Sequence, residues 1–208
     1  MTSKTNFLQQ PLNWILSSQS NVAVIRALKD SKEGMSGRAV ARAAGFTHQA
    51  CRQALSKLEA VGFIERQGSG KTQLVRLNFN HILVKDALLP LFRAEKHFTR
   101  SIRETIRKEF RDYARSATIF GSVAKKETQP GSDVDLLLVT DKKNKLRLSN
   151  KARVFEKRFI LQYGIRLSPM VFTSRNASAR YKKSDPLFEN ILSQGIDLLE
   201  ERLKDILI

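Results

Sequence analysis

The fold of the second half of the chain is decided by residues 117–139, which read ATIFGSVAKKETQPGSDVDLLLV. An apolar strand is predicted from Ala117 to Phe120, and a second one from Val134 to Val139. The Gly121-Ser122 pair ends the first strand, and a polar turn or short helix connects it to the second.

Two carboxylates, Asp133 and Asp135, stand at the start of the second strand. Side chains alternate along a strand, so this spacing places both on one face. Two carboxylates held together repel each other unless a cation lies between them. Mg²⁺ prefers oxygen ligands and usually shares a few protein carboxylates with substrate phosphates. The Gly121-Ser122 turn offers accessible N–H groups and a hydroxyl to phosphates, so the stretch predicts a phosphate and Mg²⁺ site. The alternative is an aspartate-rich turn that only precedes a buried strand.

Gly-Ser, about ten residues of spacer and Asp-x-Asp before an apolar strand resemble the signature of the DNA polymerase beta-like nucleotidyltransferase superfamily. The version here, with Ser-Asp-Val-Asp-Leu at 132–136, looks most like the small minimal nucleotidyltransferases of prokaryotes. The resemblance covers about residues 117–199 and implies a nucleoside triphosphate substrate, a hydroxyl that attacks the α-phosphorus, and pyrophosphate as leaving group. It implies catalytic and metal-binding roles for Asp133 and Asp135. It implies nucleotide binding by Gly121, Ser122, Lys125 and Ser132.

The chain departs from that family pattern at two places. Active members usually carry a third carboxylate on the strand that corresponds to residues 165–173, which here reads IRLSPMVFT and has no acid. Ser168 or a neighbour occupies the expected position, and Glu127 or Asp141 could substitute for the missing acid. The usual Arg-Gly is replaced by Lys125-Lys126. Two-metal catalysis needs ligands for both ions, so the domain either transfers nucleotides with a reduced ligand set or only binds them.

The N-terminal part predicts helices over 11–28 (with a break near 17–20), 37–44 and 48–61, then strands over 63–66 and 74–78. Two short helices around Gly45, followed by a hairpin with its tip at 68–71, resemble a winged helix-turn-helix. The second helix would then be the DNA recognition helix. The residues that this resemblance assigns to DNA are Thr47, His48, Gln49, Arg52, Gln53, Ser56, Lys57 and Lys71. The alternative is a winged helix that serves protein contact or dimerisation.

We therefore expect a two-domain α+β or α/β protein. A winged helix-turn-helix would occupy residues 1–80, a helical linker 81–115, and a nucleotidyltransferase-like mixed sheet flanked by helices 116–208. In the linker, we expect a short helix before Pro90 and a long one from Pro90 or Leu91 to about Tyr113. Its apolar stripe, Phe98, Ile102, Ile106 and Phe110, would lie on the following sheet.

The formal net charge of +17 favours polyanions, namely double-stranded DNA and nucleoside triphosphates, as partners. A single Cys and the lack of a signal peptide or a bilayer-length apolar run indicate a cytoplasmic protein without membrane contact. By analogy with other DNA-binding winged helices, a homodimer is also expected. Two functions remain open. One is an Mg²⁺-dependent nucleotidyltransferase with a DNA-binding module, and the other is a DNA-binding transcriptional regulator whose degenerate domain only senses nucleotide.

Overall fold

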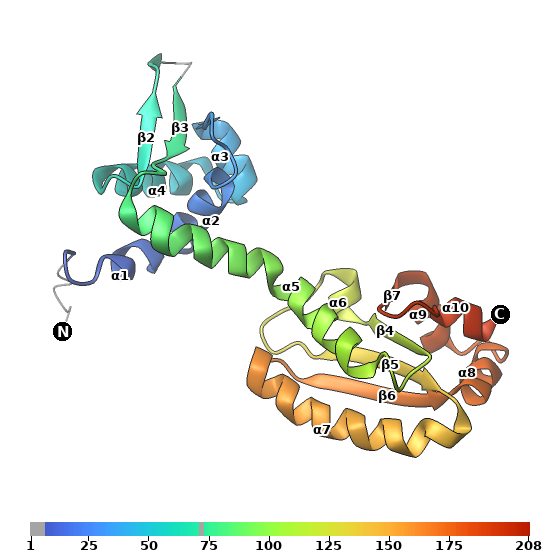
Figure 1. Cartoon of the computed structure of the whole chain (residues 1–208). Helices are drawn as coiled ribbons and strands as arrows, with labels where there is room; N and C mark the ends of the chain where they lie inside the picture. The colour runs from blue at the N-terminus through green and yellow to red at the C-terminus, as the bar shows by residue number, and fades with distance from the viewer. Residues whose placement is uncertain (1–6, 71–72) are drawn as a thin grey trace. The chain divides into compact units, whose positions relative to one another are not determined.

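The computed structural model describes residues 7–70 and 73–208, and it divides into two compact units, Met1–Lys96 and His97–Ile208. Figure 1 shows the elements of both units along the chain. The boundary falls inside the segment 81–115 that we expected as a helical linker. One helix, α5, begins in the first unit and ends in the second.

The first unit combines short helices with an antiparallel sheet. Its helices are α1 (Pro11–Leu16), α2 (Gln19–Leu28), α3 (Gly37–Ala44), α4 (His48–Ala60) and the π-helical turn η2 (Val84–Leu88). Its strands are β1 (Met35–Ser36), β2 (Ile64–Gln67) and β3 (Leu74–Leu77), in the order β1-β3-β2. The expected break near 17–20 is confirmed as the gap between α1 and α2. β1 was not expected, because two residues are too few to show a period.

Capping residues fix where the two helices before the hairpin, α3 and α4, begin. The side chains of Ser36 and Thr47 accept hydrogen bonds from the N–H groups of Ala39 and Ala50, each at 3.3 Å. Gly45 ends α3 in the left-handed conformation, with φ of 69°. The apolar face of α4 is buried: Cys51, Leu55 and Leu58 pack in one core with the β-hairpin.

The two helices that we expected around Pro90 are present. The short one is the π turn η2, and the long one is α5 (Leu89–Phe110), which follows η2 without a gap and ends three residues before Tyr113. Pro90 is the second residue of α5, and the wider π turn stands directly before it. Proline lacks the N–H that would bond four residues back, and a π turn is one way in which a helical chain accommodates that loss.

The second unit is a mixed sheet with helices on both faces. Its strands are β4 (Ser116–Phe120), β5 (Val134–Thr140), β6 (Leu167–Thr173) and β7 (Ile196–Asp197), in the order β6-β5-β4-β7. Its further helices are α6 (Ser122–Lys125), the 3₁₀ turn η3 (Lys142–Asn144), α7 (Lys145–Tyr163), α8 (Ser174–Tyr181), α9 (Pro186–Gln194) and α10 (Leu203–Leu207). β5 and β6 are parallel, and the other strand pairs of this sheet are antiparallel. A parallel pair needs a long crossover connection, which α7 provides. The basic segment after β5 forms η3 and the first residues of α7.

Side-chain alternation on β5 separates the two faces of this sheet. Leu136 and Leu138 pack with α5 and α7, in a core that includes Ile106, Phe110 and Phe159. The predicted stripe on α5 is thus confirmed for Ile102, Ile106 and Phe110, whereas Phe98 is 43% exposed. Leu137 and Val139 pack on the opposite face with α8, α9 and α10. Asp135 is two residues before Leu137, so its side chain lies on the same face of the sheet as Leu137.

Candidate active site

The paired carboxylates lie where β5 begins, between β4 and β6. Asp135 is opposite Phe120 on β4 and opposite Ser168 on β6. The hydroxyl of Ser168 donates a hydrogen bond to Oδ2 of Asp133, at 3.0 Å. A serine therefore contacts the carboxylate pair from the strand on which the sequence pattern led us to look for a third acid.

The electrostatics of this pair favour a bound cation. Burial raises the pKa of Asp135, and the neighbouring Asp133 carboxylate raises it further. Arg166 forms only a weak ion pair with Asp133. Its Nη1 lies 4.0 Å from Oδ2 of Asp133, and its side chain is largely exposed. Within residues 7–70 and 73–208, no group of three or more His, Cys, Asp or Glu side chains is arranged so that it could hold a metal ion by itself. Two carboxylates and a hydroxyl fit Mg²⁺, which commonly takes one or two protein carboxylates and completes its shell with substrate phosphates and water.

The raised pKa of Asp135 predicts a stability effect. A carboxyl whose folded-state pKa is raised destabilises the folded protein as the pH rises through that pKa. In metal-free buffer, Asp135→Asn should therefore increase the free energy of unfolding at pH 7. The gain should disappear at acid pH, where the carboxyl is protonated in both states. Urea unfolding at both pH values measures this, with exposed Asp112→Asn as the control. A loss of stability in Asp135→Asn at pH 7 would contradict the assignment.

The backbone at Gly121 passes directly over Asp135. Gly121 has φ of 70° and ψ of −148°, a region that residues with a side chain rarely enter. A Cβ atom at this position would overlap Oδ2 of Asp135. Both requirements are met only by glycine. The β4–α6 turn therefore brings Gly121, Ser122 and the carboxylate pair into one small region.

Residues 100–192 match the family model of the nucleotidyltransferase domain. The match lies within the second unit and includes Gly121, Ser122, Asp133, Asp135 and Ser168. A search of curated proteins gives no match. Among solved structures, the crystal structure of human N-acetylserotonin methyltransferase in complex with SAM is similar, with 14% sequence identity and a TM-score of 0.27. The similarity covers 50% of this chain and 36% of that chain, so it spans about a third of the methyltransferase.

The other residues that we expected at the nucleotidyltransferase site differ in their surroundings. Ser122 is half-buried and begins α6, and Lys125 is exposed at the end of the same helix. The hydroxyl of Ser132 accepts a hydrogen bond from the N–H of Gln129, at 2.9 Å, so it also closes the 129–132 turn. Glu127 is exposed in the loop.

The suggestion that Asp141 could replace the missing acid is wrong. β5 ends at Thr140, so Asp141 lies beyond the opposite end of the strand from Asp135. Six residues of strand separate the two carboxyl groups by roughly 20 Å. Asp141 instead faces Arg115, with Oδ1 3.6 Å from Nη1.

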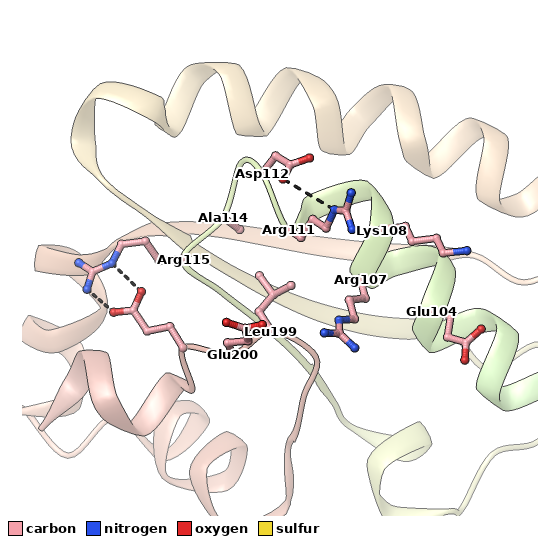
Figure 2. A pocket seen from close by; sticks show the side chains of 10 residues that line it. Glu104, Arg107, Lys108, Arg111, Asp112, Ala114, Arg115, Leu199 and Glu200 are labelled. Atoms are coloured by element: carbon pink, nitrogen blue, oxygen red, sulfur yellow. Dashed lines mark hydrogen bonds and ion pairs between the residues drawn. The ribbon is translucent and has the colours of Figure 1, made fainter.

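Two of the hollows in the second unit lie beside α5, and neither was expected from the sequence. Figure 2 shows one, of about 640 Å³, at the end of α5. Its charges are balanced, because four basic and four acidic residues line it: Arg107, Lys108, Arg111 and Arg115, and Glu104, Asp112, Glu200 and Glu201. Arg115 is bound to Glu201, and Arg111 lies beside Asp112. The other hollow, of about 650 Å³, reaches Asp133 and is mainly apolar.

The residues that we assigned to DNA share one exposed face of the first unit. Thr47, His48, Gln49, Arg52, Gln53, Ser56 and Lys57 are all exposed, at the start and along the outer side of α4. Lys71 lies outside the described residues. The two arginines of the hairpin are engaged within the unit, since Arg66 binds Glu59 and Arg76 binds Glu65.

A groove of about 730 Å³ runs between α4, the start of α3 and the hairpin. Arg38, His48, Arg52 and Arg66 line it, and none of its described lining residues is acidic. The part of the chain that the structure describes has no helix long and apolar enough to cross a membrane.

Proposed function

We propose that the second unit is an Mg²⁺-dependent nucleotidyltransferase that transfers a nucleotidyl group from a nucleoside triphosphate to a hydroxyl acceptor. The observation that carries the proposal is the Asp133–Asp135 pair, held under the Gly121 backbone and hydrogen-bonded by Ser168. The family match over residues 100–192 supports nucleotidyl transfer as the chemistry of this unit.

Each side chain then has a defined part in the reaction. Asp133 and Asp135 would hold Mg²⁺, which when bound neutralises the phosphate charge that develops during transfer. The N–H groups of the Gly121-Ser122 turn and the ammonium group of Lys125 would contact the phosphates. Ser168 fixes Asp133, because its hydroxyl donates to Oδ2.

The proposed reaction forms one bond to the α-phosphorus and breaks another. The acceptor oxygen forms a bond to the α-phosphorus, the bond from that phosphorus to the pyrophosphate oxygen breaks, and the acceptor proton passes to a base. Ser168 is a poor base, so one of the two aspartates or water has to take the proton. Transfer with this reduced set should be slow compared with an enzyme that has three acids.

The test is calorimetric titration of ATP and of GTP into the full chain, with Mg²⁺ and with EDTA. We expect saturable binding of at least one nucleotide in Mg²⁺ and little or none in EDTA. Equal binding in both buffers, or none in either, would overturn the proposal. Binding is measured before transfer because the acceptor is unidentified.

The groove of the first unit supports a second candidate function, a DNA-binding regulator whose second unit senses nucleotide. We infer that α2, α3, α4 and the β2–β3 hairpin form a winged helix-turn-helix and that α4 enters the major groove of DNA. Arg38, Arg52 and His48 gather where α4 meets the hairpin, without a carboxylate among the described residues that line the groove. Such an arrangement is suited to phosphates beside the major groove.

Duplex DNA binding should therefore be steeply salt-dependent. We expect the slope of log K against log[salt] to be about −0.9 for each phosphate contact. The variant Arg38→Ala/Arg52→Ala should flatten this slope by roughly 2 and weaken binding to unrelated sequences to a similar extent. Fluorescence anisotropy with a labelled duplex measures it, and Lys85→Ala, an exposed change outside the groove, is the control. Salt-independent binding, or equal slopes in all three proteins, would remove DNA as a partner.

A further inference from the structure

The apolar hollow of the second unit lies beside the candidate active site but on the other face of the sheet. It is bounded by the part of α5 around 98–103, the loop 128–134 and the C-terminal end of α7 with the residues after it. Ile119 and Val134 form its base from β4 and β5. Both residues belong to the core under α5 and α7, whereas Asp135 has the opposite parity on β5. A molecule in this hollow would leave the space over Asp135 and Ser168 free.

The walls of the hollow are mostly apolar. Ile102 comes from α5, Ile160 from α7 and Ile165 from the turn before β6. Ile160 is 46% exposed and stands at the opening. The volume of about 650 Å³ is in the range of pockets that bind small molecules, about 300–1,000 Å³. This lining would bury an apolar body such as a fused pair of rings.

Two guanidinium groups border this apolar lining, and neither has a close carboxylate partner. Arg103 is half-buried, and its Nε is buried without a hydrogen-bond partner among the residues described. No ion pair of Arg103 occurs within residues 7–70 and 73–208. Arg166 reaches only the distant Oδ2 of Asp133, at 4.0 Å. Buried polar groups are nearly always paired, so an uncompensated guanidinium beside a hollow points to an anion.

We propose that this hollow is a binding site for a small amphiphilic anion. The apolar body would pack against the isoleucines, and the anionic group would accept hydrogen bonds from Arg103 and Arg166. The balanced charges of the hollow in Figure 2 explain why an anion would prefer this site to that one. Asp133 also lines the hollow, whereas Asp135 and Ser168 do not. The proposal does not depend on nucleotidyl transfer, because this binding requires neither Mg²⁺ nor a nucleotide. The hollow shares Asp133 and the loop 128–134 with the carboxylate site, so an occupant would be placed to influence that site.

The test is a fluorescence titration of the full chain with 8-anilinonaphthalene-1-sulfonate in EDTA, where Mg²⁺-dependent nucleotide binding plays no part. We expect saturable binding at one site by the wild type. Arg103→Met keeps the length and apolar stem of the side chain but removes the charge, and should weaken binding about tenfold or more. The matched control is Arg107→Met. Arg107 lies one turn further along α5 and lines the charge-balanced hollow, so this variant should bind the probe like the wild type.

A second variant keeps the proposal testable if Arg103→Met does not fold. Ile160→Glu changes an exposed position at the opening and places a carboxylate against the probe, so it should also weaken binding. Displacement of the probe by 1-naphthoate or by 1-naphthyl phosphate then shows whether a carboxylate or a phosphate is preferred. The proposal is overturned by absent saturable binding, by equal affinities of the Arg103 and Arg107 variants, or by displacement with neither competitor.

Discussion

Asp133→Asn/Asp135→Asn is expected to abolish Mg²⁺-dependent nucleotide binding. The two asparagines keep the size of the side chains but remove the negative charges that would hold the cation. Without them the triphosphate and the cation have no anionic anchor on the protein. We expect an affinity loss of at least about 100-fold, or roughly 2.7 kcal/mol, in calorimetric titration with MgATP and MgGTP.

The matched control carries the same change of charge elsewhere in the second unit. Asp112→Asn/Asp141→Asn also removes two carboxylates, one beside Arg111 and the other beside Arg115 at the far end of β5. This variant should bind nucleotide like the wild type, which excludes a general effect of net charge. Unchanged binding in the Asp133/Asp135 variant would place the nucleotide somewhere else on the molecule. Binding lost to the same extent in both variants would attribute it to the overall field of the protein.

Gly121→Ala should be the most damaging single substitution at the site. Its backbone conformation costs a residue with a side chain about 1–3 kcal/mol. In addition, the new Cβ would overlap Oδ2 of Asp135, and that carboxylate would have to move. We expect urea unfolding to show destabilisation of at least this size. Where the variant folds, calorimetry should show Mg²⁺-dependent nucleotide binding that is weakened at least tenfold.

Gly131→Ala separates the two causes. Gly131 also has a left-handed φ, of 90°, but a Cβ there would meet no atom within 4 Å. This control should lose stability through backbone strain alone and keep its nucleotide affinity. If both variants bind nucleotide equally well, the close approach of Gly121 to Asp135 has no functional meaning.

The sequence by itself determined the elements that rest on local periodicity and on turn chemistry. Alternating and apolar runs predicted β4 and β5, and period-four spacing predicted the buried side of α5. Gly45 predicted the turn between the two helices that precede the hairpin. The i, i+2 spacing of Asp133 and Asp135 predicted a shared face, because strand geometry makes that a local property.

Only the tertiary structure decided which side chains contact the carboxylate pair. Ser168 contacts Asp133 across 35 positions of sequence, because the α7 crossover brings β6 alongside β5 in a parallel register. Asp141, by contrast, is kept away from Asp135 by the extended geometry of β5 itself. The amphiphilic-anion site unites α5, a loop and the end of α7, none of which has a motif of its own. A sequence pattern reports which way a side chain points along its own element, whereas a binding site depends on how separate elements pack.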